Sequence, residues 1–159
     1  MEFLMDRMQL KTEFLCRLTL NVHLPLTDVG GTPHGERLVA RITGGTFTGP
    51  KLKGHIHDGG GDWLLTGTDR VSKIDVRMTL ETDDGALLYT TYHGFRHGPD
   101  AVMADLLSGK AVDPSLYYFR TSPRFETASK KYIWLNSILT VAVGRRDPAG
   151  PVYDVYEVL

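Results

Sequence analysis

The sequence contains a single cysteine, Cys16, among its 159 residues. One thiol cannot form an intrachain disulfide, and it excludes a structural metal site built from several cysteines. Cys16 lies in the apolar segment Phe14-Leu15-Cys16-Arg17-Leu18, where no basic surroundings are evident that would stabilise a thiolate. We therefore expect a buried, unreactive thiol that points inward with Phe14 and Leu18, rather than a nucleophile.

Long apolar runs and an excess of one charge are also missing. No segment approaches the ~20 apolar residues of a membrane span, and residues 1–15, which include Glu2, Asp6 and Arg7, lack the apolar stretch of a signal peptide. The net charge of -1 comes from 18 basic and 19 acidic residues, so charge gives no reason to expect binding to nucleic acid or a membrane. These observations favour a soluble, cytoplasmic protein.

Glycine, in contrast, is abundant. The 17 glycines and 8 prolines are typical of short strands joined by turns rather than of a helical bundle. A chain of 159 residues is long enough to bury the core of one domain. We therefore expect residues 1–159 to form a single domain, with residues 1–11 as a flexible N-terminal extension.

Alternation of apolar and polar residues with a period of two predominates along the chain. The clearest case is a hairpin in which residues 74–81 and 87–93 flank the turn Asp83-Asp84-Gly85. Residues 28–35 are expected to form a loop. Further strands are predicted over residues 14–22, 38–43, 51–57, 63–66, 117–121, 133–143 and 152–158.

One helix is predicted over residues 100–107, where Asp100 can cap the N-terminus and Gly109 follows the C-terminus. Roughly eight to ten short antiparallel strands with a single helix indicate a mainly β protein, either a barrel or a sandwich.

Aromatic residues are concentrated between residues 117 and 146, around Arg120, Arg124, Glu126 and Asn136. Aromatic walls with a few fixed polar groups are typical of a small-molecule pocket, although an aromatic core has the same composition. Arginines here would suit a carboxylate or enolate oxygen, and Glu126 would be a general base or the ion-pair partner of an arginine.

Within the predicted strand 133–143, alternation places Tyr132, Trp134 and Asn136 on one face, near a cavity mouth. The alternative is structural, with the Asn136 amide satisfying neighbouring backbone groups.

The segment Gly59-Gly60-Gly61-Asp62-Trp63 combines flexible backbone with a carboxylate beside an indole. It lacks the lysine and the following helix of a phosphate-binding loop. Partial desolvation of Asp62 by Trp63 would raise its pKa towards the range useful for proton transfer. The alternative is a turn aspartate that accepts a hydrogen bond from its own backbone.

His55 and His57 lie two residues apart on a predicted strand, so they share one face and could bind a metal with His93 or His97 as a third ligand. Because a His-x-His pair also occurs in many proteins that bind nothing, we expect no metal and no other cofactor, with His55, His57 and His93 as the alternative.

Several motifs in this order resemble one family. They are Gly49-Pro50-Lys51-Leu52-Lys53-Gly54, Gly59-Gly60-Gly61-Asp62-Trp63, Tyr92-His93-Gly94, the segment from Tyr118 to Thr127, Tyr132 with Trp134-Leu135-Asn136, and Gly144-Arg145. From about residue 14 to the C-terminus the chain resembles the domain-of-unknown-function family 3237, also called uncharacterised protein family 0311.

The resemblance implies a small antiparallel β-barrel, similar to lipocalins or allene oxide cyclases, with a central cavity. It also implies that nine residues cluster in space: Asp62, Trp63, Tyr92, Arg120, Phe125, Glu126, Tyr132, Trp134 and Asn136. It assigns none of them a role, because fold analogy does not establish chemistry.

The leading hypothesis is a cofactor-independent acid–base enzyme, an isomerase, cyclase or lyase, acting on a small aromatic or unsaturated carbonyl compound. Asp62 or Glu126 would be the base and Tyr92 or Tyr132 the proton donor. Arg120 with Asn136 would hold the oxyanion. The residues expected to bind the ligand are Trp63, Tyr92, Phe125, Trp134 and Asn136. The alternatives are a non-catalytic carrier or sensor and a structural subunit, and we expect a homo-oligomer.

Overall fold

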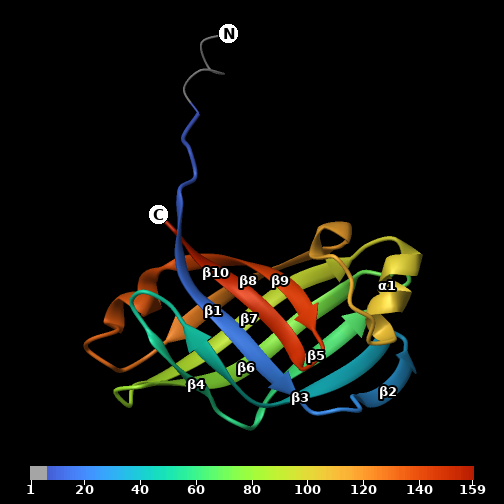
Figure 1. Ribbon diagram of the computed structural model, residues 1–159, viewed down its shortest axis with the longest axis horizontal. Helices are drawn as coiled ribbons and strands as arrows, with labels where there is room; N and C mark the ends of the chain where they lie inside the picture. The colour runs from blue at the N-terminus through green and yellow to red at the C-terminus, as the bar shows by residue number, and fades with distance from the viewer. Residues whose placement is uncertain (1–6) are drawn as a thin grey trace.

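The computed structural model describes residues 7–159, so the part of the expected N-terminal extension before Arg7 lies outside the described residues. The described residues form ten strands, one α-helix and two short 3₁₀ helices (Figure 1). Their bounds are β1 Thr12–Val22, β2 Thr27–Thr32, β3 Gly35–Thr48, β4 Lys53–Ile56, β5 Gly60–Thr66, β6 Ser72–Thr82, β7 Leu87–His97, α1 Asp100–Leu107, η2 Pro114–Leu116, β8 Tyr118–Glu126, η3 Ile133–Ser137, β9 Leu139–Asp147 and β10 Gly150–Val158.

The strands close into an antiparallel barrel. Their order is β1-β10-β9-β8-β7-β6-β4-β3-β2, and β1 also pairs with β3, which closes the ring. Strand β5 pairs with β3 and β6, as β4 does, so β4 and β5 share one of eight positions around the barrel. The predicted barrel with one α-helix is therefore confirmed.

The core follows from the alternation that the sequence shows. In β6 the residues Ile74, Val76, Met78 and Leu80 are all buried, and they alternate with more exposed residues. Strand β6 pairs with β7 from Ser72↔Arg96 to Glu81↔Leu87, which confirms the predicted hairpin and lengthens both of its strands. Because side chains on a strand alternate between faces, this pairing gives one buried and one outer face.

A β-bulge in β1 changes which residues face the core. The register with β10 shifts between Phe14 and Cys16, so Leu15 and Cys16 are both buried and Phe14 is exposed. The expectation that Phe14 points inward is wrong for this reason. Cys16 is buried as expected, and burial raises the pKa of its thiol to about 12, which makes the thiolate scarce at neutral pH.

Two other local predictions need correction. Residues 28–35, expected to form a loop, form most of β2 and the turn into β3, whose register runs from Thr27↔Val39 to Thr32↔Gly35. The helix α1 has its predicted bounds, but Pro99 is its N-cap residue and no side chain caps it. The Asp100 carboxylate instead lies 2.6 Å from Nη1 of Arg70.

The predicted strand over residues 133–143 begins only at Leu139. Residues 133–137 form η3, because the Asn136 side chain binds the backbone of Thr127: its Oδ1 accepts from the Thr127 amide at 2.9 Å and its Nδ2 donates to the Thr127 carbonyl at 3.0 Å. These bonds fold the segment back against the end of β8. Tyr132, Trp134 and Asn136 therefore do not share the face of a strand.

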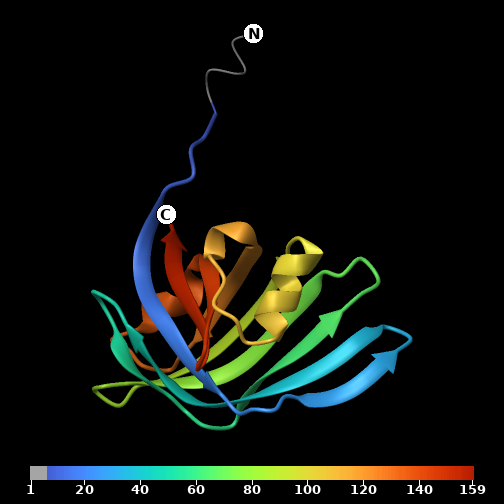
Figure 2. The same cartoon turned by 45° about the vertical axis from the view of Figure 1, so that its right-hand side comes forward.

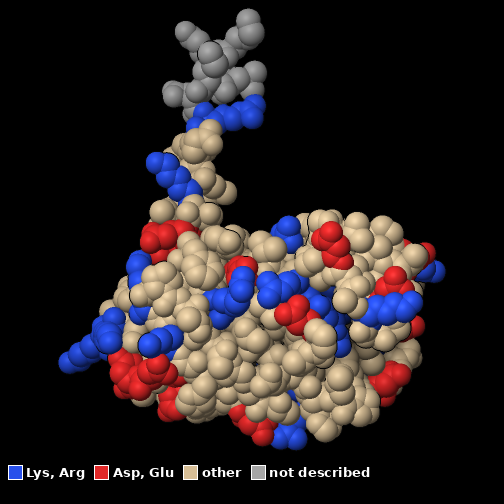
Figure 3. Space-filling view, in the orientation of Figure 1, with Lys and Arg blue, Asp and Glu red and all other residues tan. Residues whose placement is uncertain are grey.

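Helix α1 lies at one end of the barrel, beyond the ends of β5 and β7 and near the β2–β3 hairpin (Figures 1 and 2). Both signs of charge are present on the face shown in Figure 3, and several lysine or arginine side chains lie next to one another across its middle. Among the described residues, no helix has the length and apolar character that crossing a bilayer requires.

Candidate functional site

A row of paired residues crosses four neighbouring strands and faces the barrel lumen. Asp62 on β5 pairs with Ala40 on β3 and with Val76 on β6, and Val76 pairs with Tyr92 on β7. All four residues line one internal cavity. Because paired residues on neighbouring strands point to the same face of a sheet, strand register itself places the Asp62 carboxylate and the Tyr92 phenol in the same interior.

A glycine two residues before Asp62 lets β5 lie close to β6. A Cβ atom at Gly60 would come within 2.8 Å of both the Arg77 carbonyl oxygen and the Met78 Cβ. Gly59, in the turn before β5, has a φ of 111°. The glycines that precede Asp62 therefore serve the turn and the close strand approach.

Arg96 continues the inner face of β7 further along the strand. It lies four residues after Tyr92, so both side chains face inward, and it pairs with Ser72 on β6 and Phe119 on β8. Arg96 is buried, and its guanidinium carbon lies 5.5 Å from the centroid of the Phe119 ring. A positive charge is thereby held inside the barrel.

Tyr153 on β10 completes the cluster from the opposite wall. Its ring centroid lies 5.0 Å from that of Tyr92 and 5.3 Å from that of Phe119, in edge-to-face geometry. Tyr92, Tyr153 and Phe119 are each almost completely buried. The aromatic rings therefore wall a space into which a carboxylate, two phenols and a guanidinium project.

The cavity that this cluster encloses has a volume of about 30 Å³. A single water molecule needs roughly 10–15 Å³ measured in this way, so the cavity has room for about two waters or one small functional group.

A much larger hollow adjoins the cavity, and we refer to it as the vestibule. Leu64, Arg96 and Arg146 line both spaces and form a neck between them. The vestibule has a volume of about 690 Å³ and lies between α1, the β2–β3 hairpin and the loop after β5. This volume falls within the roughly 300–1,000 Å³ that is usual for small-molecule pockets.

The environment of Asp62 raises its pKa to about 6 from an ordinary value of 3.8, chiefly because burial disfavours the charged carboxylate. The Asp75 amide, which donates to Oδ1 of Asp62 at 3.0 Å, and the charge of Arg96 oppose this rise. The bond forms where the β5–β6 pairing is interrupted, between Asp62↔Val76 and Leu65↔Lys73. A carboxyl group with this pKa is largely ionised at neutral pH and can accept a proton and return it.

Two polar atoms of the cluster have no hydrogen-bond partner within residues 7–159: the Tyr92 hydroxyl and Nε of Arg96. Burial and then the neighbouring Tyr153 hold the pKa of Tyr92 well above its ordinary value, and burial also raises the pKa of Tyr153. Burial lowers the pKa of Arg96, while Tyr153 and Asp62 oppose that effect. Unpaired buried donors are costly and rare in folded proteins, and here both project into one cavity.

The raised pKa of Asp62 agrees with the sequence-based prediction, but its cause differs. Trp63 is the next residue on the strand and points to the outside of the barrel, where 39% of its surface is exposed. The lumen walls, rather than the Trp63 indole, desolvate the Asp62 carboxylate.

Three other predicted residues lie on β8, away from the cavity. Arg120 and Glu126 are on the outer face of β8 and are exposed. Arg120 donates through Nη1 to the Phe119 carbonyl at 2.9 Å and its guanidinium lies 5.3 Å from the Tyr118 ring centroid. Phe125 faces inward and belongs to the hydrophobic core, but it does not line the cavity.

The remaining predicted residues gather around η3. The Tyr132 hydroxyl donates to the Asp84 carboxylate at 3.0 Å, and Nζ of Lys51 lies 5.3 Å from the Trp134 ring centroid. Asn136 bonds backbone groups, as in the structural alternative. The nine residues expected to cluster therefore divide into separate groups, of which only Asp62 and Tyr92 share the cavity.

Arg96, Arg146 and Tyr153 were not predicted as site residues. The alternation that marks Tyr92 as inward-facing would also have identified Arg96, had the predicted strand been extended by four residues beyond 93. Tyr153 carried no comparable signal, because its neighbour Val152 is buried too and simple alternation does not distinguish their faces.

The predicted metal alternative also changes. His93 lies on β7 with its Nε2 3.2 Å from Oδ1 of Asp75, apart from His55 and His57. The acidic neighbour of that pair is Glu81.

A closed antiparallel barrel whose lumen holds a carboxylate, two phenols and a guanidinium defines the chain as a small β-barrel protein with a polar cluster inside a largely hydrophobic core. The chain belongs to the family described as "Protein of unknown function (DUF3237)", whose model matches residues 10–158. The family resemblance seen in the sequence is thereby confirmed.

Curated relatives match nearly the whole chain. A UPF0311 protein of Bradyrhizobium diazoefficiens is 35% identical over 150 residues, covering 94% of this chain and 97% of the relative. A UPF0311 protein of Rhodopseudomonas palustris is 33% identical with the same coverage.

Solved structures share the fold. A β-barrel-like protein from Acinetobacter baumannii has a TM-score of 0.84 at 38% identity, with 97% of this chain and 99% of that chain covered. A conserved protein of unknown function from Rhodopseudomonas palustris has a TM-score of 0.90 at 32% identity, with 97% and 100% covered. A structure described as an enzyme from Penicillium herquei shares the fold at 20% identity, with a TM-score of 0.73 and 97% and 98% covered.

Proposed function

We propose that the protein is a cofactor-independent acid–base enzyme, an isomerase, cyclase or lyase, that acts on a small aromatic or unsaturated carbonyl compound. One observation carries the proposal: the half-buried Asp62 carboxyl group, with a pKa of about 6, shares a cavity with the unpartnered Tyr92 hydroxyl and Arg96 Nε. Perturbed acids among convergent polar groups are characteristic of catalytic sites.

The proposed roles follow from charge and protonation state. Asp62 removes a proton from a carbon next to the substrate carbonyl, and the electron pair of the broken C–H bond moves to the carbonyl oxygen. Arg96 and the Tyr92 hydroxyl donate hydrogen bonds to that oxygen as it becomes negative. The protonated Asp62 then returns its proton to another atom of the substrate, which completes an isomerisation with no added reactant.

The vestibule suits the body of such a substrate. Its volume is about 690 Å³, whereas the inner cavity has only about 30 Å³, so the reacting carbonyl group enters through the neck while the rest stays outside. The fold that this chain shares with a protein described as an enzyme supports the proposal only as a precedent, because their identity is 20%.

The test begins with a thermal-shift screen of phenols, enones, lactones and short carboxylic acids, since a ligand of the folded state raises the unfolding midpoint. Each hit is then incubated with the enzyme in D₂O and followed by NMR. Exchange of a carbon-bound proton for deuterium, or formation of an isomer, measures the proposed proton removal.

Asp62→Asn is expected to lower the rate of exchange by about 10²–10⁴-fold, the usual contribution of a general base. Glu126→Gln is the matched control, because it also neutralises a carboxylate but on the outer barrel wall, and it is expected to keep the wild-type rate. Equal rates in wild type and folded Asp62→Asn would reject the proposed base.

The cavity also allows a carrier or sensor. A hit that both wild type and Asp62→Asn bind, and that both return chemically unchanged after long incubation, would favour that alternative over catalysis.

A further inference from the structure

His55, His57 and Glu81 form a cluster on the outer face of the barrel, whereas the lumen groups lie on its inner face. His55 on β4 pairs directly across the strands with Glu81 on β6. His57 follows the end of β4, and its amide donates to the Thr79 carbonyl at 2.9 Å. The neighbours Ile56 and Leu80 are buried in the core, so alternation directs the three polar side chains to the opposite, outer face.

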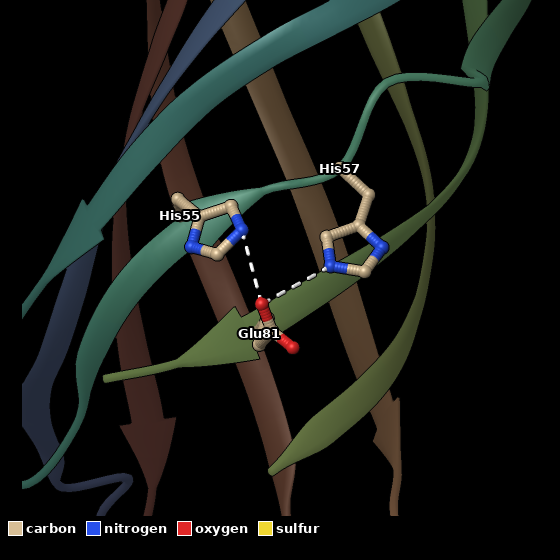
Figure 4. A group of neighbouring side chains, drawn as sticks. All are labelled: His55, His57 and Glu81. Atoms are coloured by element: carbon tan, nitrogen blue, oxygen red, sulfur yellow. Dashed lines mark ion pairs between the residues drawn. The ribbon is translucent and has the colours of Figure 1, made fainter. Parts of the chain in front are cut away.

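The three side chains converge, as Figure 4 shows. Nε2 of His55 lies 3.1 Å and Nε2 of His57 lies 3.5 Å from the same carboxylate oxygen, Oε2 of Glu81. The two imidazole rings stack with their centroids 5.4 Å apart and an angle of 27° between their planes. One ligand atom from each residue lies within 4.8 Å of the other two.

We propose that His55, His57 and Glu81 bind a divalent transition-metal ion of the zinc class. Two imidazole nitrogens and one carboxylate oxygen are a ligand set that Zn²⁺ commonly takes, with water in the fourth position. The ion replaces the direct contacts between the imidazoles and the carboxylate, so small side-chain rotations are sufficient to form the site. Each of the three side chains is partly exposed, which leaves a path for the ion and space for the water ligand.

A metal ion at this site would stabilise a part of the barrel that has few strand-pairing contacts. Strand β4 pairs with β6 only from Gly54↔Thr82 to Ile56↔Leu80, and the chain then turns into β5, which shares the same barrel position. An ion bound by His55 and His57 from one segment and by Glu81 from the other would link β4 and the following turn to β6. Metal binding to ligands on two segments stabilises the folded arrangement that brings them together.

The experiment uses the full chain without a histidine tag, stripped with a chelator and titrated with ZnCl₂ in a calorimeter. We expect saturable binding of one ion per chain. His55→Gln, His57→Gln and Glu81→Gln should each weaken binding by at least about tenfold, since loss of outer partners of a metal ligand already costs that much.

His93→Gln is the matched control. His93 is another exposed histidine that faces a cross-strand carboxylate, with its Nε2 3.2 Å from Asp75, but it has no second histidine converging on that carboxylate among the described residues. It should leave zinc affinity unchanged. Equal weakening by His93→Gln, or full binding by the His57→Gln and Glu81→Gln variants, would overturn the proposal.

Hydrogen–deuterium exchange supplies a readout independent of any activity. Zinc should slow exchange in residues 53–59 and 79–82 of the wild type and of His93→Gln, but not of Glu81→Gln. The absence of saturable zinc binding together with unchanged exchange would also overturn the site.

Discussion

The carboxyl group of Asp62 lies in the lumen because β3 and β6 pair with β5 on both sides of it, through Ala40 and Val76. That position is thermodynamically unfavourable for a charge. Burial raises the folded-state pKa to about 6 from 3.8, so the folded protein binds this proton more tightly than the unfolded chain does. Stability therefore falls as pH rises from about 4 to about 6, and the cost is fully present at pH 7.

Asp62→Asn should accordingly stabilise the protein at pH 7, by about 1–3 kcal/mol given ~1.4 kcal/mol per pKa unit. The gain should disappear near pH 4, where the wild-type carboxyl group is protonated as well. Urea unfolding at both pH values measures it. Asp58→Asn, which removes an exposed partner of Arg41, is the control and should show no comparable gain. A stability difference for Asp62→Asn that is independent of pH would contradict the assigned cause.

The sequence allowed Asp62 to be selected but not its surroundings. Its neighbour Trp63 was visible in the chain, whereas the residues that enclose it come from β3, β6, β7 and β10. Arg96 and Tyr153 join the same cavity through strand register, which the sequence of a single strand does not encode. The sequence therefore indicated Asp62 and Tyr92 separately, and the pairing of β5, β6 and β7 brings them together.

At the scale of elements, the β6–β7 hairpin and η3 show why local patterns succeed in one place and fail in another. The hairpin was predictable because alternating residues on both strands agree with the turn between them. Residues 133–137 also alternate in polarity, but the Asn136 side chain competes with strand pairing by bonding the Thr127 backbone. Such a bond between segments nine residues apart cannot be read from periodicity.

Asn136→Ala should therefore lower the free energy of unfolding by about 1–3 kcal/mol, because the Thr127 amide and carbonyl lose their partner. Urea unfolding followed by tryptophan fluorescence is the appropriate measurement. Ser137→Ala, which removes only a long 3.4 Å bond to the Trp134 carbonyl, should have a smaller effect. If Asn136→Ala kept full stability but lost ligand binding, a role in recognition would replace the structural one.

At the scale of the whole molecule, part of the outer wall formed by β7, β8 and β9 exposes apolar side chains. A groove of about 800 Å³ on this wall is lined by Phe95, Tyr118, Val141 and Val143 among others, and all four are exposed. Contiguous exposed apolar surface on a soluble protein commonly marks an interface. The wall is separate from the vestibule, so association through it would leave the proposed site accessible.

We predict that a second copy of the chain covers this wall, in keeping with the homo-oligomer expected from the sequence. The double variant Val141→Asp with Val143→Asp should sediment as a monomer in analytical ultracentrifugation, because charge on the wall opposes its burial. Val29→Asp on β2, whose side chain is also exposed, is the matched control and should keep the wild-type mass. A monomeric wild-type protein would reject the prediction.

The neck formed by Leu64, Arg96 and Arg146 would decide which features of a compound such a protein selects. A space of about 30 Å³ inside and about 690 Å³ outside imposes strict limits on the group that passes the neck and loose limits on the scaffold that carries it. Compounds of different overall shape but with the same projecting oxygen group would then compete for one site. The protein would discriminate by regiochemistry, the position of that group on its scaffold, more than by the size of the scaffold.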